Sequence, residues 1–229
     1  MEAIIFDMDG VLIDSEPLWR KAMVNKINEL FKAKNVNYNY TIQDCLATKG
    51  LKIEEVIKDL FTDYKLEFSA EIYQKLVKDI VDELKKLIKD RGKPMKGVLN
   101  LLKLCKLHKL KLGLASSSSR DIIDVVLDVL NVKNYFPIIF SGDDVKDTKP
   151  NPEIFVKTLE ALKVERNSCI IIEDSINGII AGLKSGMKVI AVPEEHDMQT
   201  ILNNPEFNRV MLLESLEEID HEFIEALCF

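Results

Sequence analysis

The sequence is short of paired cysteines, of long apolar runs and of positive charge, and each shortage excludes a class of protein. Its four cysteines are scattered with no C-x-x-C pair, so we expect a reduced, cytoplasmic protein in which Cys105 and Cys169 pack as small core residues. No apolar run approaches the roughly 18 residues of a membrane-spanning helix, and Glu2 and Asp7 interrupt the apolar core that a signal peptide needs. The net charge of −7 argues against nonspecific binding of nucleic acid.

The rest of the composition is ordinary for a soluble globular protein. Of the 229 residues, 47% are hydrophobic and 30% are charged. This length suits one large domain, or one domain that carries a smaller insertion. We expect a monomer that binds neither membranes nor nucleic acid.

Strand and helix patterns alternate over residues 97–192. Apolar, β-branched runs predict strands, and apolar residues at helical spacing predict the helices between them. The predicted strands are 3–6, 110–115, 138–140, 169–172 and 188–192, and the predicted helices are 97–108, 120–130, 151–162 and 176–184. This alternation is typical of an α/β fold with a doubly wound, Rossmann-like parallel sheet. Beyond residue 193 we expect one more strand near 210–213 and a final helix.

Residues 17–90 contain no strand pattern and instead form a helical block. Apolar stripes predict helices over 17–34 and 53–61 and a longer one that begins after Ser69, while residues 34–40 are typical of a loop. We therefore predict an α/β catalytic core made of residues 1–15 and 92–229, with an all-helical cap domain, residues 16–91, inserted into it. The two linkers would let the cap hinge.

The first strand ends in two acids and a glycine, Asp7-Met8-Asp9-Gly10. Residues i and i+2 of an extended chain point to the same side, and the carboxyl edge of a parallel sheet is where ligands bind. Two carboxylates at one point repel each other, so the pair predicts either a divalent metal or one acid that stays protonated. Taken alone, the stretch also fits a simple Asp-Gly turn. An EF-hand loop fits less well, because its first position would be Ile5 and a strand precedes it.

Four consecutive serines lie between the predicted strand 110–115 and the helix that begins at Arg120. Strand-to-helix connections in α/β units are only a few residues long, which argues against a flexible linker. Hydroxyls and unpaired N–H groups at a helix amino terminus bind anions. We predict that Ser116 contacts a phosphate beside Asp7. Contacts further along the substrate are predicted for the residues that follow, Ser117, Ser118, Ser119 and Arg120.

Lys149 lies in a loop that two prolines stiffen, Pro150 and Pro152. An exposed loop lysine is the plain alternative, but an ammonium held near carboxylates and a phosphate would offset their negative charge. The strand 169–172 then repeats the design of the first strand and runs directly into Glu173 and Asp174.

Acids therefore follow two strands of one sheet. Carboxylate oxygens are the ligands that Mg²⁺ prefers. We predict a Mg²⁺ site formed by Asp7, Asp9, Glu173 and Asp174.

These motifs resemble, in order, the four motifs of the haloacid dehalogenase superfamily of phosphotransferases. The matching residues are Asp7-x-Asp9-Gly10-Val11, Ser116, Lys149-Pro150 and Glu173-Asp174. The resemblance spans residues 4 to 192, and the helical insertion is similar to the helical cap of that family. Within the superfamily, the chain is similar to β-phosphoglucomutases and to bacterial 2-deoxyglucose-6-phosphate and hexitol-phosphate phosphatases.

Two positions favour the phosphatases over the mutases. Trp19 stands where the mutases have a histidine, and residues 50–53 replace a cap loop in which they have an arginine. The resemblance leaves Trp19, Lys49 and Lys52 as candidate contacts from the cap to the substrate.

The resemblance implies Mg²⁺-dependent hydrolysis of a small sugar phosphate through an aspartyl phosphate. Asp7 would be the nucleophile, and Asp9 would act as general acid and then as general base. Ser116 and Lys149 would contact the phosphoryl oxygens. Two alternatives stay open: a β-phosphoglucomutase-type phosphotransferase, and a catalytically silent binding protein with the same fold.

Overall fold

The computed structural model describes residues 1–47, 53–67 and 69–228. The chain divides into two compact units, one formed by Met1–Asp14 and Gly92–Phe229 and the other by Ser15–Arg91. Among the described helices, none is both long and apolar enough to cross a membrane.

The larger unit is built around a six-stranded sheet in the order β3-β2-β1-β4-β5-β6. All neighbouring strands pair in parallel. The strands are β1 (Ala3–Phe6), β2 (Lys111–Ala115), β3 (Ile138–Phe140), β4 (Cys169–Glu173), β5 (Lys188–Ala191) and β6 (Val210–Leu212). The predicted doubly wound α/β fold is confirmed.

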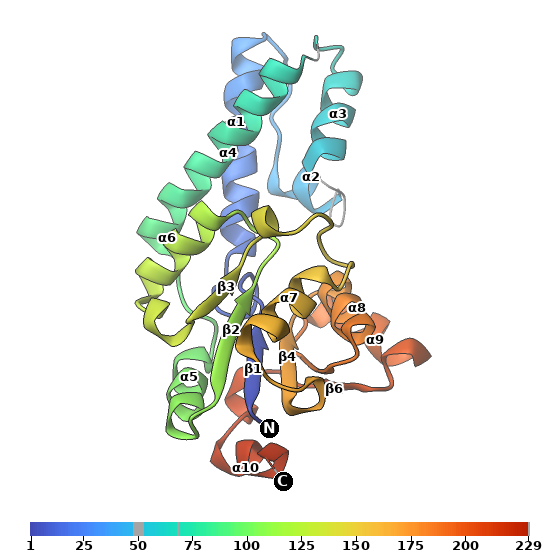
Figure 1. The fold of residues 1–229 in the computed structure, drawn as a ribbon. Helices are drawn as coiled ribbons and strands as arrows, with labels where there is room; N and C mark the ends of the chain where they lie inside the picture. The colour runs from blue at the N-terminus through green and yellow to red at the C-terminus, as the bar shows by residue number, and fades with distance from the viewer. Residues whose placement is uncertain (48–52, 68, 229) are drawn as a thin grey trace. The chain divides into compact units, whose positions relative to one another are not determined.

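Helices cover both faces of this sheet (Figure 1). The chain runs in one direction along the sheet from β1 through β2 to β3. From β3 it crosses to β4 and then runs in the opposite direction through β5 to β6. A crossover has one preferred hand, so the two directions place their helices on opposite faces. On one face lie α5 (Val98–Leu107) and α6 (Arg120–Leu130); on the other lie α7 (Glu153–Leu162), α8 (Ile176–Ser185) and α9 (Glu195–Asn203).

The remaining elements of this unit are short. Single 3-10 turns are η1 (Lys133–Tyr135), η2 (Gly142–Asp144), η3 (Arg166–Ser168), η4 (Pro205–Phe207) and η5 (Leu216–Glu218), and the last helix is α10 (His221–Cys228). The predicted elements end within two residues of the observed ones, but α9 and the 3-10 turns were not predicted. The prediction that Cys105 and Cys169 are core residues is confirmed, since both are fully buried.

The register of the central strands places three loops at one edge of the sheet. Phe6, the last residue of β1, lies level with Leu114 of β2 and Ile172 of β4. The residues that follow these three strands are the first acids, the serines and the second acids. Parallel pairing therefore delivers the predicted chemistry to a single edge.

The smaller unit is helical in its described residues, and its elements are α1 (Glu16–Ala33), α2 (Ile42–Ala47), α3 (Ile53–Asp63) and α4 (Ala70–Arg91). The two long helices, α1 and α4, are joined by a hydrogen bond of 2.8 Å from Asn25 Nδ2 to Glu83 Oε1. A small apolar core forms around Ile27 and Phe31 of α1. The helix α2 has no counterpart among the predicted helices. Its six residues are too few for a periodic pattern.

Candidate active site

Asp7 directly follows β1 and is held by the neighbouring strand. Its backbone N–H donates to the carbonyl of Ile172 at 3.0 Å, which continues the ladder between β1 and β4 by one residue. Only 9% of its side chain is exposed. The carboxylate therefore lies in a fixed place at the carboxyl edge of the sheet.

Lys149 connects the ends of three strands through one ammonium group. Its Nζ donates to Asp7 Oδ1 at 2.5 Å, to Glu173 Oε1 at 2.6 Å and to the carbonyl of Ala115 at 3.0 Å. It also lies 4.7 Å from the centre of the Phe155 ring, on α7. Burial lowers the pKa of Lys149, but the two carboxylates outweigh burial and hold this pKa above its ordinary value. Lys149 is therefore a buried, charged side chain and not the exposed loop lysine of the alternative interpretation.

Three carboxylates gather beside this ammonium, those of Asp7, Glu173 and Asp174. One oxygen from each lies within 4.8 Å of the others. Burial raises the pKa of Asp7 to about 7, with further contributions from Glu173 and Asp9 and with Lys149 opposing them. Burial and then Glu173 and Asp7 raise the pKa of Asp174 well above its ordinary value. Within the described part of the chain, three acids and the one lysine that contacts them leave an excess of negative charge, which a hard divalent cation would neutralise.

Glu173 differs from the other two acids because its oxygens already accept hydrogen bonds from the protein. Oε1 accepts from Lys149, and Oε2 accepts from the backbone N–H groups of Asp174 and Ser175 at 2.9 and 3.0 Å. The Ser175 hydroxyl donates to Oε2 as well, at 3.1 Å. Asp7 and Asp174 therefore have more lone pairs to offer a cation than Glu173 has.

Gly10 allows the two acidic loops to approach each other. Its φ of +75° lies in the left-handed region, which disfavours residues with a side chain. A Cβ at this position would also overlap the Asp174 carboxylate. Gly10 therefore permits both the turn after Asp9 and the close approach of Asp174, which with Asp7 and Glu173 forms what we call the acidic cluster.

The Asp9 carboxylate faces the loop of four serines between β2 and α6, residues 116–119, which we call the serine loop. Its Oδ2 accepts a hydrogen bond of 2.8 Å from Ser118 Oγ, and Ser116 Oγ lies at 3.5 Å. Ser116 Oγ in turn accepts from the backbone N–H of Ser118 at 3.1 Å. The group of carboxylates that can share one cation consists, among the described residues, of Asp7, Glu173 and Asp174 and not the side chain of Asp9. The two acids of the first motif thus have different partners.

The end of the serine loop is turned toward α6. Ser119 Oγ donates to Asp121 Oδ1, and Arg120 Nε lies 3.4 Å from Asp124 one turn further along the helix. Ser119 occupies the N-cap position, but its side chain makes no capping hydrogen bond. The predicted substrate contacts from Ser119 and Arg120 thus start from side chains that are engaged within their own helix.

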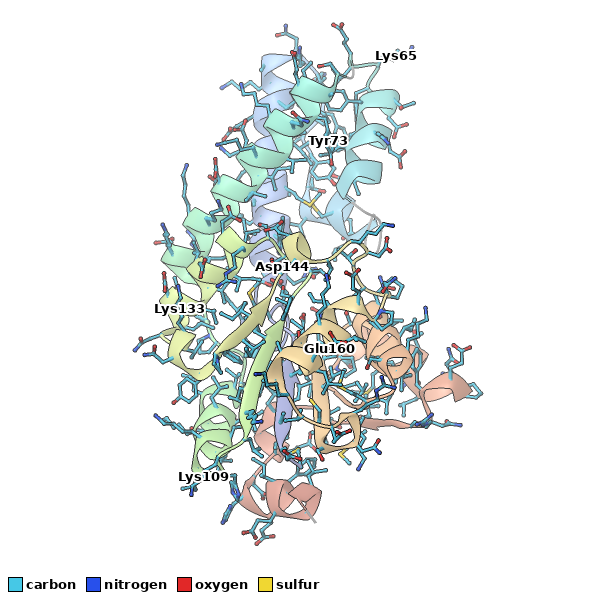
Figure 2. The ribbon with its side chains drawn as sticks, in the orientation of Figure 1. Lys65, Tyr73, Lys109, Lys133, Asp144 and Glu160 are labelled. Atoms are coloured by element: carbon cyan, nitrogen blue, oxygen red, sulfur yellow. The ribbon has the colours of Figure 1, made fainter. Side chains whose placement is uncertain are left out.

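Two residues of η2 hold the serine loop, and the sequence interpretation assigned neither a role. Asp143 Oδ2 accepts from the backbone N–H of Arg120 at 2.8 Å, at the position where an anion would bind a helix amino terminus. The Gly142 N–H donates to the carbonyl of Ser118 at 3.0 Å, and a Cβ on Gly142 would overlap the Ser117 carbonyl. Figure 2 labels the next residue of η2, Asp144. A glycine and an acid directly after a strand were the only sequence signal.

The predicted contacts from the cap stay predictions. Trp19 lies in α1 of the helical unit and is half-buried there. Lys49 and Lys52 lie outside the described residues.

The sequence is similar to that of known proteins over most of its length. The sequence profile of the haloacid dehalogenase-like hydrolases matches residues 4–192. Hexitol phosphatase B of Escherichia coli is 31% identical over 191 residues, which cover 83% of this chain and 83% of that protein. The phosphorylated carbohydrates phosphatase of Thermotoga maritima is 33% identical over 190 residues, which cover 83% and 84%.

A solved structure extends the similarity to almost the whole chain. The β-phosphoglucomutase of Clostridium difficile has a TM-score of 0.76 and 26% sequence identity, and the similarity covers 99% of this chain and 96% of that one. The chain belongs to the haloacid dehalogenase-like hydrolase family.

Proposed function

We propose that this protein is a Mg²⁺-dependent phosphatase that hydrolyses a small sugar phosphate through an aspartyl phosphate on Asp7. One observation carries the proposal. Asp7 is fixed at the end of β1 between the Lys149 ammonium and the Asp174 carboxylate, while Asp9 faces hydroxyls instead. Relatives of about 30% identity are named as phosphatases of hexitols and phosphorylated carbohydrates, which supports the substrate class.

The first step needs an ionised nucleophile and a proton donor for the sugar oxygen, so that the sugar leaves as a neutral alcohol. The Asp7 carboxylate attacks phosphorus, the bond from phosphorus to the sugar oxygen breaks, and that oxygen takes the proton of Asp9. The Lys149 ammonium holds the Asp7 carboxylate in one orientation and opposes the rise in its pKa. In this proposal Lys149 also contacts the phosphoryl oxygens and offsets their negative charge.

The second step returns both acids to their starting states. Asp9, now ionised, accepts a proton from water while the water oxygen attacks phosphorus, and the bond from phosphorus to Asp7 breaks. The hydroxyls of Ser118 and Ser116 contact Asp9 Oδ2 and orient its carboxyl group for both proton transfers.

The carboxylates of Asp7 and Asp174 would hold the cation, since the oxygens of Glu173 already accept from four donors. An all-oxygen donor set with excess negative charge fits Mg²⁺. When bound, Mg²⁺ would neutralise charge on the phosphoryl oxygens and keep the acids that hold it ionised.

We assign residues 16–91 the role of a cap domain. In support, the helical residues form a compact unit of their own that two short linkers join to the α/β unit. Closure of such a unit would exclude water from the phosphoryl transfer. In this proposal Trp19, Lys49 and Lys52 contact the sugar.

A panel of sugar, hexitol and nucleotide phosphates, assayed for released phosphate with Mg²⁺ and with EDTA, tests the proposal. We expect Mg²⁺-dependent release from a subset of the sugar phosphates. The Asp7→Asn variant should release none while keeping its circular dichroism spectrum and melting temperature. Release by Asp7→Asn at the wild-type rate would remove Asp7 from the role of nucleophile.

The similarity to a β-phosphoglucomutase supports a second candidate, transfer of phosphate between positions of a sugar. β-Glucose 1-phosphate with a trace of glucose 1,6-bisphosphate separates the two reactions. A phosphatase forms free phosphate and glucose, whereas a mutase forms glucose 6-phosphate. Conversion to glucose 6-phosphate without free phosphate would replace our proposal with the mutase.

A further inference from the structure

A cavity lies in the α/β unit, away from the carboxyl edge of the sheet that carries the acids. Its volume is about 390 Å³, within the range of about 300–1,000 Å³ that is typical of small-molecule sites. It opens beside the first residues of β5, the edge strand β6, the end of α8 and α10. Its apolar lining includes Ile170, Leu183, Met187, Met211 and Leu227.

The winding of the sheet explains why this space exists. The connections β3 to β4, β4 to β5 and β5 to β6 all step in one direction, so α7, α8 and α9 cover the same face. The other face of β4, β5 and β6 receives no crossover helix. In Figure 1, α10 lies near the end of the sheet where the chain begins. This helix is only eight residues long.

One row of side chains lies on the face of β4, β5 and β6 that no crossover helix covers. Ile170 pairs with Lys188, and Ile190 pairs with Met211, so these residues of adjacent parallel strands share a face. Met211 is 42% exposed although it belongs to a strand of the sheet. An exposed methionine at the mouth of an apolar cavity offers a soft, adaptable surface to a ligand.

The polar groups around the cavity are all potential donors to an anion. Lys188, Arg209 and Asn167 line it, and their side chains make no hydrogen bond or ion pair within the described part of the chain. No acidic residue belongs to the described lining. Arg166 adds a third positive charge, since a Cβ on the lining residue Gly186 would lie 3.1 Å from Arg166 Nη1. In a chain of net charge −7, this local excess of positive charge is distinctive.

We propose that this cavity binds an amphipathic anion, specifically a free medium-chain carboxylate. The apolar chain enters between Ile170, Met211 and Leu227, and the carboxylate remains at the mouth within reach of Arg209 and Lys188. Desolvation of the ligand's hydrocarbon chain supplies the affinity. The guanidinium of Arg209 and the ammonium of Lys188 select a charged head group over a neutral one. This site is independent of the proposed phosphatase activity, because none of its residues lies in the acidic cluster or the serine loop.

Titration of the full-length protein with decanoate, below the concentration at which it forms micelles, tests the site. We expect saturable one-to-one binding by calorimetry, with NMR shift changes at the methyl groups of Met187 and Met211. Affinity should fall about fourfold for each methylene removed from the chain, which is the scale of burying one methylene. The neutral alcohol 1-decanol should bind more weakly than decanoate.

Three variants localise the binding. Arg209→Gln should weaken decanoate about fivefold, the scale of one partly exposed charge-assisted hydrogen bond. Lys103→Gln, which removes an exposed positive charge from α5, is the matched control and should bind as wild type. Met211→Trp should abolish binding by filling the cavity, with an unchanged circular dichroism spectrum.

Several results would overturn the proposal. Equal binding of decanoate and 1-decanol would show that the charged groups select nothing. Equal losses in Arg209→Gln and Lys103→Gln would show a general charge effect. Shift changes at the acidic cluster alone would place decanoate in the catalytic site. A concentration-dependent dimer that Met211→Trp disperses would assign the face to a second copy of the chain.

Discussion

The most direct test of the acidic cluster is the removal of the Lys149 ammonium, which donates to two of its carboxylates, by the substitution Lys149→Met. Methionine keeps an unbranched side chain of similar length, so the change removes the charge and leaves little cavity. The Lys149 side chain is 6% exposed and donates to Asp7 and to Glu173, whose side chain is fully buried. The variant therefore leaves buried carboxylates without their positive partner.

The expected loss of stability follows from the cost of an unpaired buried charge. Removing one partner of a buried ion pair costs about 3–5 kcal/mol. Protonation of the acids limits this cost, since each pKa unit corresponds to about 1.4 kcal/mol. Because Lys149 opposes the rise in the pKa of Asp7, to about 7 in the wild type, the pKa of Asp7 in the variant must lie higher.

The direction of the pH dependence follows from proton uptake. Asp7 has a higher pKa in the folded state than its ordinary value of 3.8, so the folded state binds more protons and stability falls as pH rises between the two values. In the wild type this fall ends near pH 7. In Lys149→Met it continues to higher pH. The difference between the proteins should therefore grow above pH 7, from about 3 toward about 5 kcal/mol.

Urea denaturation at pH 5.5, 7 and 8.5, in EDTA, measures this difference. The control is Lys157→Met, which removes a lysine from a partly exposed pair with Glu153 at 2.7 Å. It should cost less than about 1 kcal/mol at every pH. A loss in Lys149→Met that does not change with pH would mean that Lys149 contributes packing rather than charge, and would refute the reasoning.

Three further predictions concern the chemistry of the same site. Asp9→Asn should slow turnover about 10²–10⁴-fold, and acid quenching should trap labelled phosphoenzyme; unimpaired hydrolysis would contradict the role of Asp9. Ser118→Ala removes the 2.8 Å hydrogen bond that orients the Asp9 carboxyl group and should lower kcat about fivefold, the scale of one hydrogen bond, at unchanged melting temperature. Ser118→Thr keeps the hydroxyl and is the control, and an equal kcat in all three proteins would exclude this role. Mg²⁺ affinity, measured by calorimetry, should rise at least about tenfold per pH unit below pH 7, because the Asp7 proton must leave; an affinity independent of pH would show that Asp7 is not a ligand.

Most of the α/β unit could be predicted because its signals are local. A buried strand needs a short run such as Cys169-Ile170-Ile171-Ile172, and parallel pairing then brings the residues after each strand to one edge. Prediction of Asp7 and Asp174 as neighbours therefore needed only the strand ends and the topology, whereas Lys149 was predicted from the two prolines around it and from the resemblance.

The missed elements lack such local signals. The helix α2 is six residues long and starts at a turn in which the Thr41 N–H and hydroxyl donate to Asp44. A periodic pattern needs two or three turns before it stands out. The hydrogen bond of Asp143 to the serine loop was equally hidden, because its partner, Arg120, lies 23 residues away.

The roles of Asp7 and Asp9 show most clearly what spacing alone cannot decide. The two acids are the same residue type, two positions apart at the end of one strand. Their difference comes from residues more than 100 positions away: Lys149 is paired with Asp7, and Ser118 donates to Asp9. The ammonium opposes the rise in the pKa of Asp7 and fixes its carboxylate, whereas the Ser118 hydroxyl orients the carboxyl group of Asp9. Exchange of these two environments, and not of the acids themselves, would therefore be required to exchange their roles.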